Sequence, residues 1–141
     1  SIPNQIIDYT WGREHTFFDG PQVEHIDFSW PYCEALRTQL LQAASATGVN
    51  AVDGGTYGAT QGPRLESAAE ISRMEQDGCD IVGMTGMPEA GLARELELCY
   101  ACCAVSANWA AGKSEGEITM EEITENLKSG MAQVKEIINA L

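Results

Sequence analysis

The chain has 141 residues and a net charge of −13, and 44% of its residues are apolar. This length suits one domain with a buried core, and the apolar content argues against disorder. A surface this acidic repels phosphate backbones, which makes nucleic-acid binding a poor interpretation, and no apolar run reaches the roughly 20 residues of a membrane helix.

The first third of the chain predicts a strand, a long loop and a helix. The strand is Ile2–Tyr9, and the polar, aromatic loop Trp11–Ser29 contains both histidines, His15 and His25. Pro31 is typical of the first turn of a helix, and the apolar residues that follow it recur at helical spacing. A glycine at position 48 ends this helix.

The middle of the chain alternates strand and helix. A glycine-rich strand at Val49–Thr60 precedes a helix at Ser67–Gln76, which Gly78 ends. A short strand at Asp80–Met84 precedes a helix from Pro88 to about residue 97. The apolar run Leu98–Ala107 predicts a strand buried on both faces of a parallel sheet.

The last element is an amphipathic helix. Thr119, with Glu122 three residues later, has the pattern of a capping box. One apolar stripe follows, formed by Ile123, Leu127, Met131, Val134, Ile138 and Leu141. This order of elements predicts an α/β domain with helices packed on a mostly parallel or mixed sheet.

The five cysteines are Cys33, Cys79, Cys99, Cys102 and Cys103. Their odd number and apolar neighbours predict reduced thiols and a cytoplasmic protein. The run from 99 to 103 superficially resembles a metal motif, but no second Cys/His cluster completes four ligands. We therefore expect small buried side chains there and no metal site.

Ligands of such folds gather where strands end and loops begin. Three segments have this character here: Gly62–Glu66, Gly83–Glu89 and Ser106–Trp109. Glu66 is either an acidic residue favoured by a helix dipole or a carboxylate that accepts a ring N–H. Asn108 is either a turn residue or an amide that pairs with one edge of a planar ligand.

Other residues have ordinary explanations on their own. Met84 fits core packing, and Thr85 fits a helix cap, although a hydroxyl at a helix N-terminus also suits an anion. His25 fits a solvated loop residue. Met120 and Ile123 fit core positions of the last helix.

Two blocks of sequence carry a family resemblance. Gln61-Gly-Pro-Arg-Leu-Glu-Ser-Ala-Ala-Glu70 and Asp80-Ile-Val-Gly-Met-Thr-Gly-Met-Pro-Glu89 resemble the trimeric purine nucleoside phosphorylases, especially their methylthionucleoside branch. The resemblance covers nearly the whole chain and implies a three-layer α/β fold. It makes residues 1–141 the C-terminal part of one such domain. A glycine-rich phosphate loop and an Arg-His pair of the family have no counterpart here.

The resemblance also assigns roles at the base and phosphate. Gly83 and Met84 match substrate-binding positions, with Met84 against the ribose, and Thr85 matches a position that touches phosphate. Leu65 stands where the family usually has a phenylalanine against the base. Glu66 and Asn108 then match the acid and amide of phosphorylases acting on 6-oxopurines, with Asn108 as the catalytic residue that stabilises the leaving purine.

The adenine-handling branch differs at these positions. It resembles this chain with a small hydroxyl side chain at 66 and aspartates at 108 and 110, where this sequence has Glu66, Asn108 and Ala110. A carboxylate suits the N1–H of a 6-oxopurine, whereas it would face the N1 lone pair of adenine. A site built for buried polar pairing rejects the mismatched base.

The sugar end of the implied site favours an apolar 5′ group. Inosine- and guanosine-cleaving relatives place a histidine where this chain has Met120, and Ile123 follows on the same helix. His25 matches a histidine that the methylthio branch inserts into a neighbouring subunit of a homotrimer. Together these positions favour 5′-methylthioinosine, with inorganic phosphate as co-substrate and no metal or organic cofactor.

Three alternatives remain open from the sequence. The first is a general purine nucleoside phosphorylase for inosine and guanosine, and the second is a 5′-methylthioadenosine phosphorylase. The third is a fragment that only binds or assembles with other chains. We expect the 141 residues alone to be inactive.

Overall fold

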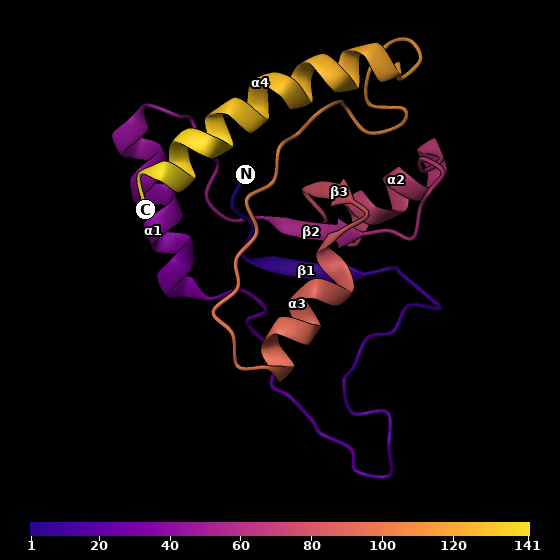
Figure 1. Cartoon of the computed structure of the whole chain (residues 1–141). Coiled ribbons are helices and arrows are strands. Elements are labelled where there is room, and N and C mark those ends of the chain that lie inside the picture. Colours follow the sequence, from indigo (N-terminus) through magenta and orange to yellow (C-terminus); the bar gives the residue numbers. More distant parts are fainter.

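A parallel three-stranded sheet forms the centre of the computed structural model, which describes all of residues 1–141 (Figure 1). The strands are β1 (Gln5–Asp8), β2 (Thr56–Ala59) and β3 (Ile81–Gly83), in the order β1-β2-β3. Gln5 pairs with Thr56, and Ala59 pairs with Gly83. The three carboxyl ends therefore lie at one edge, as the α/β prediction requires.

Four helices surround the sheet: α1 (Glu34–Thr47), α2 (Ala68–Gln76), α3 (Gly86–Glu95) and α4 (Met120–Asn139). Gly48 ends α1 in the left-handed conformation, with φ of 74°. Thr119 caps α4 by accepting from the Glu122 N–H at 3.3 Å. None of the four helices combines the length and the apolar character of a membrane span.

Two predicted helix starts lie elsewhere. The predicted helix at Pro31 begins at Glu34, because the backbone of Cys33 is extended and its N–H donates to the Tyr100 carbonyl. The helix predicted to start at Pro88 is α3, which begins two residues earlier, at Gly86. Its backbone is interrupted at Met87, where φ and ψ are −122° and 142°. A residue that precedes proline is driven out of the helical region by the proline ring.

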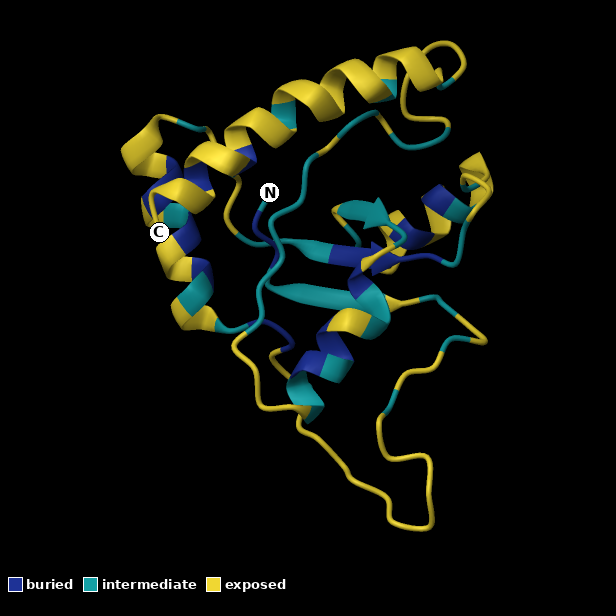
Figure 2. Ribbon diagram, viewed as in Figure 1, coloured by how far each residue is buried: buried dark blue, intermediate teal, exposed yellow.

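The core lies where α1, α4 and the chain start meet (Figure 2). Its members are Ile2, Leu40, Ala43, Ala44 and Ile137. The predicted apolar stripe of α4 is only partly buried, since Val134 is 9% exposed while Leu127 and Ile138 are 38% and 55% exposed. The first turns of α4 extend past the sheet, so their apolar side chains have little to pack against (Figures 1 and 2).

The prediction of a strand at Leu98–Ala107 is wrong. This segment crosses beside the chain start (Figure 1), where Ala104 and Ser1 exchange two backbone hydrogen bonds of 2.8 Å. In an antiparallel ladder the next bonded pair would join Pro3 to Cys102. Proline has no N–H, which removes one of the two bonds of that pair, and the Pro3 carbonyl accepts from Arg37 Nε at 3.0 Å, so the ladder consists of one pair.

The prediction of five reduced thiols is also wrong, because Cys33 and Cys99 form a disulfide. The hydrogen bond from Cys33 to Tyr100 brings the two segments together, and the two Cα atoms are 5.1 Å apart. Cysteine usage therefore does not support a reducing compartment. Among the free thiols, burial raises the pKa of Cys102 to about 11, which disfavours the thiolate that binds metals.

Candidate functional site

The carboxyl ends of β2 and β3 bring two predicted loops together. Thr60, directly after β2, donates its backbone N–H to the Gly83 carbonyl at 2.8 Å. The chain then runs through Gly62 to Glu66 on one side and through Met84 to Thr85 on the other. Glu66, Gly83, Met84 and Thr85 thus lie on adjacent strand ends, as predicted.

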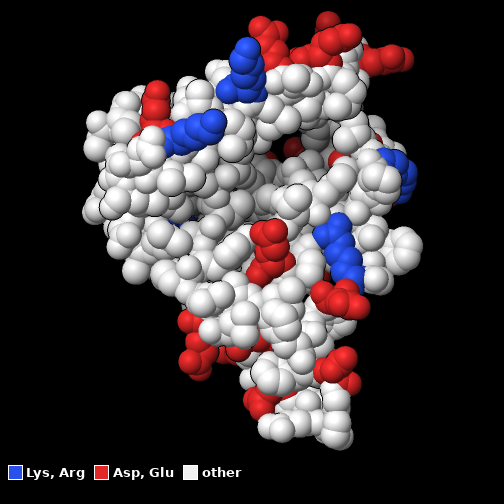
Figure 3. Space-filling model, in the orientation of Figure 1, with Lys and Arg blue, Asp and Glu red and all other residues white.

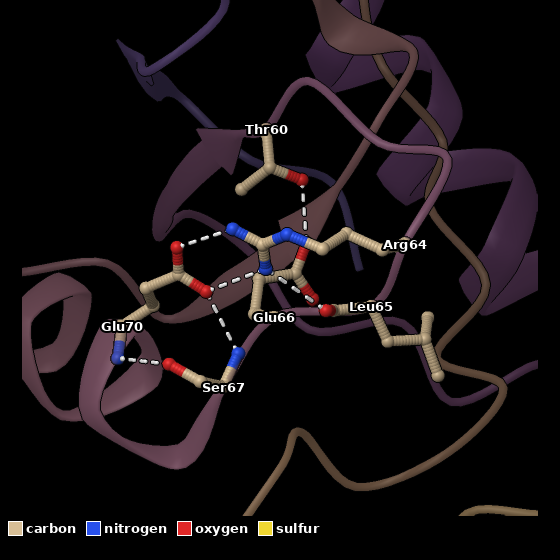
Figure 4. Close-up of polar contacts among 6 residues, drawn as sticks. All are labelled: Thr60, Arg64, Leu65, Glu66, Ser67 and Glu70. Carbon is tan, nitrogen blue, oxygen red and sulfur yellow. Dashed lines mark hydrogen bonds and ion pairs between the residues drawn. The ribbon is translucent and has the colours of Figure 1, made fainter.

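The carboxylate of Glu66 is held at one oxygen and free at the other. The Thr60 hydroxyl donates to Glu66 Oε1 at 2.6 Å (Figure 4), and Thr60 is only 6% exposed. Glu66 is half-buried, and its Oε2 has no partner within the chain. One oxygen thereby fixes the orientation, and the other can accept a ligand N–H.

The turn that carries Glu66 is anchored separately. Ser67 caps α2 in a capping box with Glu70, and Arg64 donates to both Glu70 oxygens at 2.8 Å (Figure 4). Because the cap is Ser67 and the first-turn acid is Glu70, the helix does not use Glu66. Glu66 therefore lies just before the cap and outside the first turn, where the helix-dipole interpretation had placed it.

Buried Tyr57 shapes the loop that carries Met84 and Thr85. A Cβ at Gly83 would clash with the Tyr57 hydroxyl, and one at Gly86 would lie 2.9 Å from the tyrosine ring. The same hydroxyl accepts from the Thr85 N–H at 3.4 Å. Gly83 thus has a packing role that its sequence did not reveal.

Thr85 is the N-cap of α3, but its side chain makes no capping hydrogen bond. The residue is exposed, so the hydroxyl is open to solvent at a helix N-terminus, where anions are favoured. The Met84 side chain lies over Gly62, where an added Cβ would clash with its sulfur. The Met84 side chain therefore borders the Glu66 loop.

Asn108 lies between α2 and α4. Asn126 of α4 donates to the Ala107 carbonyl at 2.7 Å, and a Cβ at Gly112 would lie 2.7 Å from the Ala68 methyl group. These contacts place one side of the Asn108 segment beside α4 and the other beside the start of α2. The Asn108 amide itself donates to the Trp109 carbonyl at 2.7 Å.

A hollow lies beneath α4 in the space-filling view, with an acidic side chain visible inside it (Figure 3). Met120 is 70% exposed on the first turn of α4, and Ile123 is half-buried. Leu65 is 46% exposed. Within one chain, Met120 and Leu65 therefore do not form a closed apolar pocket.

His25 is not brought to these residues. It is exposed, and the loop that contains it extends away from the body of the molecule (Figure 1). The sequence-based interpretation missed Thr60 and Tyr57, which hold Glu66 and Thr85. Their positions in and just after a predicted strand at the ligand edge were the available signal.

The arrangement is that of an α/β protein with a candidate ligand site at the carboxyl ends of parallel strands. The family comparison is specific: a model described as the phosphorylase superfamily matches residues 1–141. The chain belongs to this superfamily.

Two similar proteins indicate the branch. A protein of Pseudomonas syringae pv. tomato named "Probable S-methyl-5'-thioinosine phosphorylase" is 61% identical over 95% of this chain and 55% of its own length. The 6-oxopurine nucleoside phosphorylase of Pyrococcus furiosus is 44% identical over 99% of this chain and 55% of its own length. The chain thus spans about half the length of the curated relatives it matches.

A solved structure confirms the fold. Methylthioadenosine phosphorylase from Schistosoma mansoni in complex with adenine superposes with a TM-score of 0.91 at 32% identity. The match covers 99% of this chain and 56% of that one. The nucleoside phosphorylase-like α/β fold, predicted from the sequence, is therefore confirmed.

Proposed function

We propose that a full-length protein containing this sequence cleaves a 6-oxopurine nucleoside by phosphorolysis. The preferred substrate is 5′-methylthioinosine, and the products are hypoxanthine and 5-methylthioribose 1-phosphate. The observation that carries this proposal is the Glu66 carboxylate, with Oε1 held 2.6 Å from the Thr60 hydroxyl and Oε2 unpartnered. The names of the similar proteins support the same substrate class.

Base recognition follows from hydrogen-bond complementarity. The free Glu66 oxygen accepts the N1–H of a 6-oxopurine, and Thr60 keeps that oxygen from rotating away. Adenine has a lone pair at N1, so Glu66 would be left facing an acceptor. This mismatch favours a 6-oxopurine over the adenine bound in the Schistosoma mansoni enzyme.

Catalysis would be stabilisation of the leaving base. As inorganic phosphate attacks C1′ and the bond to N9 lengthens, negative charge develops on the purine. Asn108 would stabilise it at N7, after exchanging its present bond to the Trp109 carbonyl for one to the ligand. Thr85, with its free hydroxyl, would contact phosphate, and Met84 would pack against the ribose. Neither a metal nor an organic cofactor enters this scheme.

The 5′ end of the sugar distinguishes two candidate substrates. Met120 and Ile123 offer apolar contact to a methylthio group, which a hydroxyl would not favour. However, Met120 is 70% exposed within this chain. That exposure keeps a general 6-oxopurine nucleoside phosphorylase, acting on inosine and guanosine, as the second candidate.

Assembly would complete the sugar pocket. We propose a homotrimer in which the loop containing His25 reaches a neighbouring site. This loop exposes large apolar side chains: Trp11 is 74%, Val23 66% and Phe17 54% exposed. Exposed apolar residues concentrated on one projecting segment are typical of a protein interface.

The test is a comparison of nucleosides with the full-length protein. Hypoxanthine or adenine release is measured from 5′-methylthioinosine, inosine and 5′-methylthioadenosine. We expect 5′-methylthioinosine to have the highest kcat/KM, and Met120→His to shift the preference toward inosine. A wild-type preference for inosine would favour the second candidate.

The base assignment has its own variants. Glu66→Gln should abolish the preference for 6-oxopurines, whereas Glu136→Gln, on the exposed far end of α4, should leave it unchanged. No turnover of any nucleoside would favour a binding or assembly role instead.

A further inference from the structure

Arg13 connects the two loops of the candidate site. It lies in the segment after β1, at the same sheet edge, and its residue is half-buried. This arginine precedes the histidines in a loop that the sequence marks only as polar and aromatic. Its guanidinium points inward to the strand ends, unlike the exposed loop residues beyond it.

Every N–H of the Arg13 guanidinium is used. Nε donates to the Gln61 side-chain oxygen at 3.2 Å, and the Nη2 group donates to the Thr60 and Gln61 carbonyls at 3.1 and 2.9 Å. The Nη1 group donates to the Met84 carbonyl at 2.9 Å and to the Met87 carbonyl. One rigid, planar group thus holds the loop after β2 and the loop after β3.

The partners of Arg13 are neutral. None of the five ion pairs includes it, so no carboxylate of this chain is paired with it. Gln61 is fixed in turn, because its side-chain oxygen also accepts the Trp11 N–H at 3.1 Å. Five bonds to loop oxygens fit a group that sets loop geometry.

The two loops hold different parts of the substrate. The loop after β2 carries Glu66, which faces the base, and the loop after β3 carries Met84 and Thr85, which face ribose and phosphate. Phosphorolysis needs base, sugar and phosphate in one geometry, and a displacement of about 1 Å costs about a hundredfold in rate. A change in the distance between these loops should therefore lower the rate of phosphorolysis more than it weakens the binding of either ligand alone.

We infer that Arg13 is a positioning residue that sets the base-binding loop against the ribose- and phosphate-binding loop. This inference rests on the proposed function for its catalytic consequence. Its structural content is independent of the substrate: loss of Arg13 should loosen both loops together.

The experiment uses Arg13→Gln and Arg13→Lys in the full-length protein, with Arg73→Gln on the exposed face of α2 as the matched control. For both Arg13 variants we expect kcat to fall about tenfold to a hundredfold. The dissociation constants of hypoxanthine alone and of phosphate alone should change by less than roughly threefold. The control should match wild type.

The lysine variant separates positioning from charge. Lysine keeps the positive charge but lacks the planar fork that spans both loops. If Arg13→Lys retains wild-type kcat, the charge alone matters and the inference is overturned. An equal loss of ligand affinity and kcat in both variants would indicate general damage, which also overturns it.

Hydrogen exchange gives a readout that does not depend on activity. Amide hydrogens of residues 60–66 and 84–88 should exchange faster in both Arg13 variants, while those of α1 keep their wild-type rates. Unchanged exchange in either loop overturns the inference. If the wild type turns over no nucleoside, the proposed function fails, and the exchange rates still decide whether Arg13 joins the loops.

Discussion

Replacing Thr60 with valine tests whether the Glu66 carboxylate is held for base recognition. Valine keeps the branched shape of threonine and removes only the hydroxyl that donates to Glu66 Oε1 at 2.6 Å. A hydrogen bond to a charged group contributes about 1.5–3 kcal/mol, and the half-exposed Glu66 places this one at the low end. About 1.4 kcal/mol corresponds to a tenfold change. We therefore expect kcat/KM for 5′-methylthioinosine to fall about tenfold.

The assay is hypoxanthine release by the full-length protein, with Thr60→Ser as the matched control. Serine retains the hydroxyl and should keep most of the activity. In a double-mutant cycle, Thr60→Val should have almost no further effect once Glu66→Ala is present, because alanine has no side-chain acceptor for the hydroxyl. A tenfold loss that persists in the Glu66→Ala background, or wild-type activity of Thr60→Val, would refute the reasoning.

Three other predictions concern stability and completeness. Cys33→Ser should destabilise the fold by about 4 kcal/mol in the loop-entropy account, since Cys33 and Cys99 are 66 residues apart; denaturant unfolding with and without reductant measures this. The Arg64 guanidinium lowers the pKa of Glu70 to about 2. The ion pair therefore contributes to folding stability above about pH 4.5, and this stability is lost as the pH falls through 2. Glu70→Gln should therefore lower the Tm more at pH 7 than at pH 2, and an equal shift at both would contradict the pairing. Residues 1–141 expressed alone should release no hypoxanthine from any nucleoside, because the similar proteins are nearly twice as long; measurable turnover would show that this half suffices.

Local sequence signals predicted the elements that depend on neighbouring residues. The helix predicted at Ser67–Gln76 has Ser67 as its cap, and Gly48 ends α1 as predicted. Such signals work because their hydrogen bonds join residues only a few positions apart. The alternation of strands and helices then predicted where the strand ends, and with them Glu66 and Thr85, would meet.

Partners distant in the sequence could not be predicted in this way. The strand at Leu98–Ala107 fails because Pro3, about a hundred positions earlier, cannot donate to it. The Cys33–Cys99 bridge likewise depends on a contact across 66 residues.

The sequence by itself determined the family and the α/β order, and it singled out Glu66 as the candidate residue for base recognition. A carboxylate, an amide and the two glycine-proline blocks are readable without coordinates. Only the tertiary structure revealed that Thr60 orients that carboxylate and that Arg13 joins the two loops. Both are single polar residues whose partners are carbonyls or a side chain on adjacent strand ends, and no local pattern marks such contacts.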